Sequence, residues 1–165
     1  MKIIVFSDSH GRADAMQRVI AMHPDAEMIL HAGDGAREFD YITEENPGIS
    51  CVGVPGNCDF FGAKNPSSVT LDLDGVRIFL THGHRFSVKS GYDTITAHAR
   101  ENDIDIAVFG HTHVPLDRYL PGDDGQKPLR LFNPGSISHP HGGYPTYGLI
   151  EIRRSGILCS VAEYK

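Results

Sequence analysis

In the first third of the chain, three short apolar segments alternate with two segments of helical periodicity. This alternation restricts the fold more than any other feature. The apolar segments are Lys2–Ser7, Glu27–His31 and Ser50–Val54, each typical of a buried strand. Between them, apolar residues recur at helical spacing over Ala13–His23 and Ala36–Ile42. A β-α-β-α-β order predicts a parallel sheet, because parallel neighbouring strands need a crossover connection.

The pattern then changes to alternating apolar and polar residues. Val69–Leu73 and Val76–Leu80 alternate on either side of Asp74-Gly75, which predicts a hairpin. Asp105–Phe109 is another apolar strand segment. Four further segments are typical of antiparallel strands: Leu116–Leu120, Leu129–Phe132, Tyr147–Arg153 and Ile157–Glu163.

One more helix is expected between the hairpin and the Asp105–Phe109 strand. Ser90-Gly91-Tyr92-Asp93 has the spacing of a capping box, and Tyr92, Ile95 and Ala99 share a helix face. Together, the elements predict an α/β to α+β fold with two stacked sheets and helices outside. We expect one domain spanning residues 1–165, since this length suits a single core.

Composition excludes several classes of protein. Apolar runs such as Ile3–Phe6 have four residues, whereas a spanning helix needs about 20, so no membrane protein is expected. A net charge of −6 and the lack of a basic, aromatic stripe disfavour long nucleic acids as ligands. The chain begins Met1-Lys2 and enters a strand, without a signal peptide pattern. Three cysteines without a CxxC spacing suit a reducing compartment, so we expect a cytoplasmic protein.

Five of the predicted strands are followed by residues that commonly bind metals, and the chain has ten histidines. Ligands of open α/β sheets bind outside the carboxyl ends of the strands, so these residues are expected to converge. The segments are Asp8-Ser9-His10, Gly33-Asp34, Gly56-Asn57-Cys58-Asp59, His82-Gly83-His84 and Gly110-His111-Thr112-His113. Singly, such residues are commonly helix caps or solvated loop residues, but capping does not require imidazoles.

The chemistry of these side chains indicates a pair of divalent cations. Asp, Asn and His offer oxygen and nitrogen, which suits Mn²⁺, Fe, Co, Ni or Zn²⁺. Two such ions and the carboxylates of Asp8 and Asp34 leave a local charge of about +2, which attracts a phosphoryl group. A water bridging the ions loses its proton easily and becomes the nucleophile.

The order of these motifs resembles that of the calcineurin-like metallophosphoesterase superfamily, in its small bacterial and archaeal phosphodiesterase branch. The resemblance covers Met1 to His113 and extends to Asn133-Pro134-Gly135-Ser136. It implies a four-layer α-β-β-α sandwich of two mixed sheets and a dinuclear centre. One ion would take Asp8, His10 and His113, the other would take Asn57, His82 and His111, and Asp34 would bridge them. We expect Mn²⁺, with Fe, Ni, Co or Zn²⁺ as alternatives.

Three neighbouring residues are candidates for catalytic or supporting roles. Many family members have a histidine, proposed to protonate the leaving group, where this chain has Cys58; inert packing is favoured over a nucleophilic thiol. Asp59 would orient a ligand or the Asn57 loop, or it would only cap a turn. His84 would contact the phosphate, support His82 or be solvated. Because a thiol is a weak acid, activated aryl diesters should be the better substrates.

Other histidines have plainer interpretations. We interpret His31 as a buried, hydrogen-bonded side chain. His139 and His141 lie in a Gly/Pro-rich stretch, where a loop is favoured over a wall of the substrate cleft.

The expected function is metal-dependent hydrolysis of a small phosphodiester by an attacking hydroxide that bridges the two ions. A phosphomonoesterase would use the same ligands. A non-catalytic scaffold of the same fold is the other alternative, although all seven ligand positions are of ligand type. Edge strands in the C-terminal half leave a homo-oligomer open.

Overall fold

The first sheet carries the parallel strands of the N-terminal segment and two strands from the C-terminus. The computed structural model describes residues 1–59, 65–123 and 125–165. The strand order is β10-β9-β1-β2-β3, with β1 parallel to β2, β2 parallel to β3, and β9 antiparallel to both β1 and β10. The bounds are β1 Lys2–Phe6, β2 Met28–His31, β3 Ser50–Gly53, β9 Thr146–Arg153 and β10 Gly156–Glu163.

The second sheet is also mixed, in the order β4-β5-β6-β8-β7. Its bounds are β4 Ser68–Leu73, β5 Val76–Thr81, β6 Ile106–Val108, β7 Leu116–Leu120 and β8 Leu129–Asn133. The predicted hairpin joins β4 and β5, and its turn residues Asp74 and Gly75 both have positive φ, at 49° and 82°. The expectation that the later strands are antiparallel is wrong for β8, which pairs parallel with β6 and antiparallel with β7.

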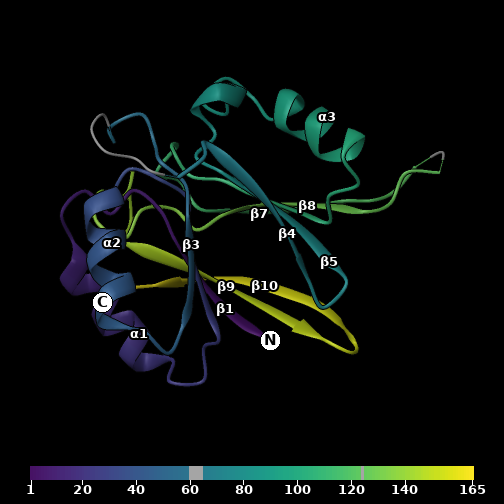
Figure 1. Cartoon of the computed structure of the whole chain (residues 1–165). Helices are drawn as coiled ribbons and strands as arrows, with labels where there is room; N and C mark the ends of the chain where they lie inside the picture. The colour runs from purple at the N-terminus through teal and green to yellow at the C-terminus, as the bar shows by residue number, and fades with distance from the viewer. Residues whose placement is uncertain (60–64, 124) are drawn as a thin grey trace.

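Helices cover the outer faces of the sheets, which produces the four layers that the sequence predicts (Figure 1). The helices are α1 Ala13–Met22, α2 Ala36–Glu45 and α3 Asp93–Glu101, with a short 3-10 helix η1 at His84–Phe86. Along β1, Ile3 and Val5 face the core between the sheets, whereas Ile4 and Phe6 face the core that α1 and α2 cover. α3 packs on the second sheet around Ile95 and Ala99.

The predicted capping box at Ser90 is wrong. α3 begins at Asp93, its N-cap is Tyr92, and no side chain caps it. Ser90 instead closes a turn, because its amide donates to the carbonyl of Ser87. The sequence has the spacing of a capping box, but Ser90 belongs to the turn after η1 and does not cap the helix.

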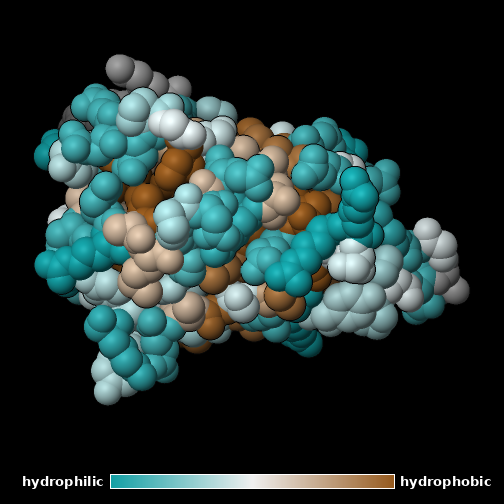
Figure 2. All heavy atoms as spheres, turned by 90° about the horizontal axis from the view of Figure 1, so that it is seen from below, coloured by the Kyte–Doolittle hydropathy of each residue, from teal (hydrophilic) through white to brown (hydrophobic). Residues whose placement is uncertain are grey.

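Apolar side chains reach the surface in separate patches. The face seen in Figure 2 shows brown apolar atoms interrupted by teal hydrophilic side chains.

Among the described residues, no helix has the length and hydropathy needed to cross a membrane. Cys51, Cys58 and Cys159 are free thiols.

Candidate metal centre

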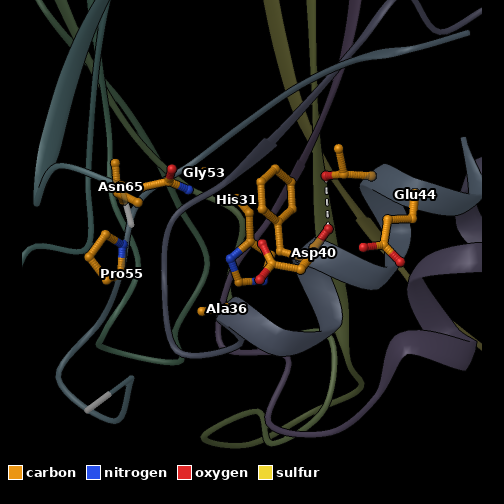
Figure 3. Close-up of a pocket in the computed structure, with 10 residues that line it drawn as sticks. His31, Ala36, Asp40, Glu44, Gly53, Pro55 and Asn65 are labelled. Carbon is orange, nitrogen blue, oxygen red and sulfur yellow. Dashed lines mark hydrogen bonds between the residues drawn. The ribbon is translucent and has the colours of Figure 1, made fainter. Parts of the chain in front are cut away.

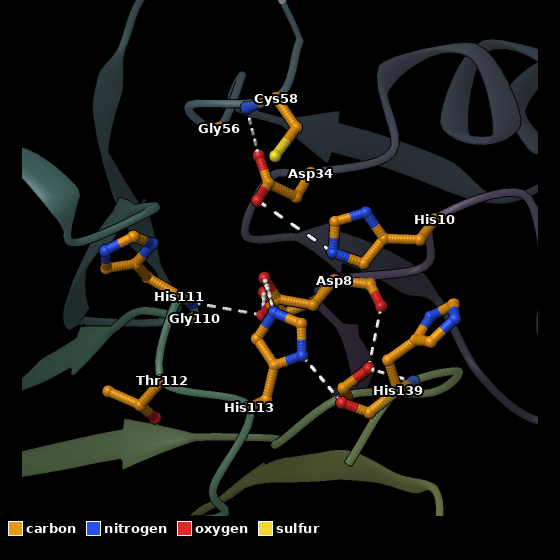
Figure 4. A network of polar contacts seen from close by, with 12 residues as sticks. Asp8, His10, Asp34, Gly56, Cys58, Gly110, His111, Thr112, His113 and His139 are labelled. Carbon is orange, nitrogen blue, oxygen red and sulfur yellow. Dashed lines mark hydrogen bonds and ion pairs between the residues drawn. The ribbon is translucent and has the colours of Figure 1, made fainter. Parts of the chain in front are cut away.

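The candidate ligands lie together where the strands of both sheets end. Asp8 follows β1, Asp34 follows β2 and His82 follows β5. Figure 4 shows Asp8 and Asp34 converging from different loops with His10, His111 and His113. Parallel strands place their carboxyl ends at the same edge, so residues distant in sequence meet there. The remaining candidates come from the same edge: Asn57 after β3, and His111 and His113 after β6.

The backbone at these positions is unusual, because five candidate ligands have left-handed φ angles. They are Asp8 (52°), His10 (37°), Asp34 (57°), His111 (68°) and His113 (57°). Asp and His tolerate this region better than most residues, yet it is still sparsely populated. Such conformations persist where the surrounding structure enforces them, and they cluster at functional sites.

Two glycines leave room for the closest approaches between loops. A Cβ at Gly56 would collide with the carboxylate and the amide of Asp34, and a Cβ at Gly110 would collide with the Ser7 hydroxyl. The glycines before Asn57 and His111 are therefore explained by packing at the strand ends.

Asp8, His10 and His113 form the first cluster of ligand atoms, which we call the His113 group. The Asp8 Oδ2 accepts hydrogen bonds from the Ser7 hydroxyl (2.7 Å) and the His111 amide (3.0 Å). The His113 Nδ1–H donates to the carbonyl of His139 at 2.6 Å, which leaves the Nε2 lone pair facing Asp8 Oδ1 at 3.2 Å. That buried oxygen has no hydrogen-bond partner.

Asp34, His82 and His111 form the second cluster, which we call the His82 group. The His82 Nδ1–H donates to the carbonyl of Ala32 at 2.7 Å. Its Nε2 therefore lies with a lone pair 3.1 Å from Asn57 Oδ1 and 3.4 Å from Asp34 Oδ2. The same Asp34 oxygen is 4.0 Å from the His10 Nε2, so it lies between the two groups.

In both groups, acceptor atoms face one another, and a cation between them would satisfy both. The pKa of His113 is raised, first by its contact with Asp8. Burial alone would lower the pKa of His82, but the carboxylates of Asp34 and Asp8 outweigh it and raise that pKa. Burial and the neighbouring His82 lower the pKa of His111 to about 4, which keeps it neutral and able to bind a cation. The residues thus fit divalent cations.

Asp59 supports the Asp34 loop through the backbone. Its carboxylate accepts hydrogen bonds from the amides of Asp34 (2.9 Å), Gly35 (3.1 Å) and Ala36 (2.9 Å), at the N-terminus of α2. It also accepts from the Gly56 amide at 2.8 Å, which closes its own turn. The Asp59 carboxylate therefore has both of the roles that the sequence left open: it caps a turn, and it supports the loop of a candidate ligand.

His31 links the loops that carry Asp8 and Asp34. It is 1% exposed, and Figure 3 shows it in the wall of a cavity of about 260 Å³ beside α2. Its Nδ1 accepts from the Gly33 amide at 3.1 Å, so the proton lies on Nε2 and is directed at the Ser9 hydroxyl, 3.1 Å away. Burial lowers its pKa to about 4. The sequence predicts its burial, but the link between the two loops appears only in the structure.

Cys58 is exposed, and its amide donates to Asp34 Oδ1 at 2.7 Å. Burial and the nearby Asp34 carboxylate raise the pKa of its thiol to about 11. Its sulfur also lies within 4.8 Å of potential ligand atoms of His10 and Asp34, a cluster that sequence reasoning missed. The spacing Asp34 to Cys58 gave no signal for this contact, since it depends on how the two loops meet.

His84 lies beside the His82 group without belonging to it. Its ring centroid is 5.3 Å from that of His82 and 6.1 Å from that of His111. Its Nδ1 is buried without a hydrogen-bond partner. Burial and His82 lower its pKa.

Comparison with known proteins decides the family. The family description "Calcineurin-like phosphoesterase superfamily domain" matches residues 1–155. The chain belongs to this superfamily. This confirms the resemblance and, because the calcineurin-like family is metal-dependent, it agrees with the candidate ligand clusters.

Three relatives illustrate the similarity to other calcineurin-like phosphoesterases. "Probable metallophosphoesterase YsnB" of Bacillus subtilis is 30% identical over 85% of this chain and 77% of its own length. "Phosphodiesterase YfcE" of Escherichia coli K12 is 30% identical over 92% of this chain and 88% of its own. A solved structure of a predicted phosphoesterase from Streptococcus pneumoniae TIGR4 has a TM-score of 0.81 and 29% identity, covering 99% of this chain and 89% of the other.

In this calcineurin-like phosphoesterase, the segment Asn133–Ser136 supports the site from behind. The Asn133 Nδ2 donates to the carbonyl of Gly110 and to the hydroxyl of Thr112, both at 3.0 Å. The Ser136 hydroxyl donates to the carbonyl of Asp8 at 2.8 Å. This segment, to which the resemblance extends, therefore fixes the loops after β1 and β6.

Proposed function

We propose that the protein is a phosphodiesterase that hydrolyses a small phosphodiester with two divalent cations, Mn²⁺ being the expected pair. The observation that carries the proposal is the convergence of acceptor atoms in the His113 and His82 groups, which cations between them would satisfy. The E. coli relative named as a phosphodiesterase supports the choice of a diester substrate.

The residues that would hold each cation follow from the two groups. Asp34, whose oxygen lies between the groups, would contribute to both sites. When bound, the two cations would activate water for attack on phosphorus and neutralise charge that develops on the phosphoryl oxygens. One site would use Asp8, His10 and His113, and the other Asn57, His82 and His111.

The chain's own residues prepare both sites. Burial would raise the pKa of Asp34, but its contact with His82 and the hydrogen bond from the Cys58 amide lower it, so the carboxylate is ionised. The carbonyls of Ala32 and His139 hold the Nδ1 protons of His82 and His113, which directs both Nε2 atoms inward. His84 is proposed to contact the phosphate, since its ring lies beside those of His82 and His111.

Leaving-group chemistry limits the substrates. The thiol of Cys58, with its pKa raised to about 11, is too weak an acid to protonate a departing alkoxide efficiently. Phenolates leave without such help. We therefore expect aryl phosphodiesters to be hydrolysed faster than alkyl ones, and Cys58→His to improve the alkyl substrates.

A metal and substrate panel tests the proposal. The metal content of the purified protein is measured, the protein is stripped with a chelator, and Mn²⁺, Fe²⁺, Co²⁺, Ni²⁺ or Zn²⁺ is restored separately. Activity is followed on bis(p-nitrophenyl) phosphate and p-nitrophenyl phosphate, which share a leaving group. We expect Mn²⁺-dependent hydrolysis that favours the diester.

Asp34→Asn should abolish this activity, and Asp14→Asn, at an exposed position on α1, is the matched control. Full activity after chelation, or in Asp34→Asn, would overturn the proposal. A clear preference for the monoester would replace it with phosphomonoesterase activity.

A further inference from the structure

An open hollow of about 470 Å³ lies beside the His113 group. This volume falls within the usual range for small-molecule sites, roughly 300–1,000 Å³. Its lining is unusual in composition, because it consists of four imidazoles and a proline: His10, His113, His139, Pro140 and His141.

The imidazoles already form a set of aromatic contacts. The His113 and His141 rings are stacked, with centroids 5.0 Å apart and an interplanar angle of 24°. The His10 ring is 5.3 Å from that of His113, and it meets His139 edge to face at 5.5 Å and 82°. Aromatic pairs prefer centroid separations of about 4.5–7 Å, so a further flat ring would fit the same pattern.

Backbone hydrogen bonds hold this part of the chain, and the outer side chains are left exposed. The His139 carbonyl accepts from His113, and the His139 amide donates to the Ser136 hydroxyl at 2.7 Å. The His141 amide donates to the carbonyl of His113 at 3.1 Å. The imidazoles of His139 and His141 are exposed, and neither belongs to a cluster of potential metal ligands.

The hollow adjoins the candidate metal centre. Two of its walls, His10 and His113, are proposed cation ligands, so the hollow begins where the phosphoryl group would bind. A group attached to phosphorus would therefore extend from His10 and His113 toward His139 and His141, the other imidazoles of the lining. Flat aromatic groups gain most from such walls.

We propose that this hollow binds a planar aromatic group, aryl or heteroaryl, that is attached to the phosphorus of the substrate. The inference rests on the proposed function and names the substrate class of the same site. His139 and His141 are then specificity-determining residues for the aromatic group, and they take no part in holding cations.

Binding of two phosphonates tests this inference. Phenylphosphonate and ethylphosphonate present the same charged group and differ in the aromatic arm. Their dissociation constants for the Mn²⁺-loaded protein are measured by calorimetry. We expect phenylphosphonate to bind about tenfold more tightly, which corresponds to the ~1.4 kcal/mol of a favourable aromatic contact.

Three variants of the hollow and one control locate the preference. His139→Ala and His141→Ala keep the backbone groups that support His113, so the bound Mn²⁺ should be unchanged while the preference falls to about threefold or less. His141→Phe restores a ring and should restore the preference. His23→Ala removes an imidazole at the C-terminal end of α1 and should leave the preference intact.

The outcomes separate this inference from the proposed function. Equal binding of both phosphonates, or an unchanged preference in both alanine variants, would overturn the subsite. Loss of Mn²⁺ from the alanine variants would also overturn it, because the rings would then be ligands. Mn²⁺-dependent diester hydrolysis without an aromatic preference would overturn the subsite alone. An aromatic preference without hydrolysis of any phosphodiester would overturn the proposed function alone.

Discussion

The two ligand groups use the same device on different supports. In each, a histidine Nδ1–H donates to a backbone carbonyl, and Nε2 faces a carboxylate. For His82, which is fully buried, the carbonyl belongs to Ala32, directly after the internal strand β2. For His113, whose side chain is 15% exposed, the carbonyl belongs to His139 in an exposed loop. The His82 group is therefore held by the sheet, whereas the His113 group is held by a loop. We therefore expect the His82 group to bind its cation more tightly.

The largest expected effect comes from removing each histidine in turn. His82→Ala should lose the tightly bound cation and His113→Ala the weakly bound one, and each should lower kcat/KM by about 10³-fold. Calorimetric titration of the stripped protein with Mn²⁺ would show which binding step disappears. Loss of the same step in both variants would break the distinction between the groups.

The link between the two groups through His31 predicts a pH effect on stability. The pKa of His31 is lowered from 6.5 to about 4, so the unfolded chain binds a proton more readily than the folded one. Its contribution is complete above the unfolded pKa and is lost as pH falls from about 6.5 towards 4. His31→Gln keeps an acceptor for Gly33 and a donor for Ser9 without titrating.

Denaturant unfolding of the stripped protein measures this contribution. The stability of the wild type relative to His31→Gln should fall by about 2–3 kcal/mol between about pH 7.5 and about pH 4.5. Comparison with the variant cancels the other titrating groups that the two proteins share, such as His111. A constant difference across this range would show that His31 is not held neutral by burial.

Asp59 supports the loops of the His82 group by accepting hydrogen bonds from four backbone amides. Asp59→Asn should therefore weaken cation binding at the His82 group. Asparagine offers one acceptor and two donors, and the donors would oppose the amides of the loop. Support of this kind is typically worth about 10–100-fold in metal affinity. Asp93→Asn, at the exposed start of α3, is the control. An unchanged Mn²⁺ affinity in Asp59→Asn would reduce Asp59 to a turn cap.

The smallest effect is expected at Ser136, which supports the loop side. Ser136→Ala removes the hydrogen bonds to the Asp8 carbonyl and from the His139 amide. The variant should lose about 1–2 kcal/mol of stability. Its second, weaker Mn²⁺ binding step, at the His113 group, should weaken several-fold, and the first step, at the His82 group, should be unaltered. Thermal unfolding and Mn²⁺ titration of the same preparation measure both. A weaker first step would contradict the assignment of Ser136 to the His113 group.

The elements that the sequence predicts well are those with a local signal. The parallel order of β1, β2 and β3 follows from apolar segments and helical spacing, and Asp74-Gly75 locates the hairpin. The candidate ligands were also found locally, because each lies within a few residues of a strand end.

The supporting contacts had no local signal, because they join distant residues. Asp59 contacts Asp34 across 25 positions, Ala32 contacts His82 across 50, and Ser136 contacts Asp8 across 128. Such contacts depend on how the loops of two sheets meet, which periodicity does not encode. The wrong prediction of a capping box for α3 has the opposite cause. The local spacing at Ser90 is present, but Ser90 takes part in the turn after η1 instead.

The left-handed backbone at five candidate ligands has an evolutionary consequence. Each non-glycine residue in this conformation costs roughly 1–2 kcal/mol, which glycine would avoid. Selection for stability alone would therefore replace Asp8, Asp34 and their neighbours with glycine or asparagine. Descendants that no longer needed the centre should drift in that direction. Replacement of the aspartates and histidines at these turns would then be the first sign that the centre had been lost.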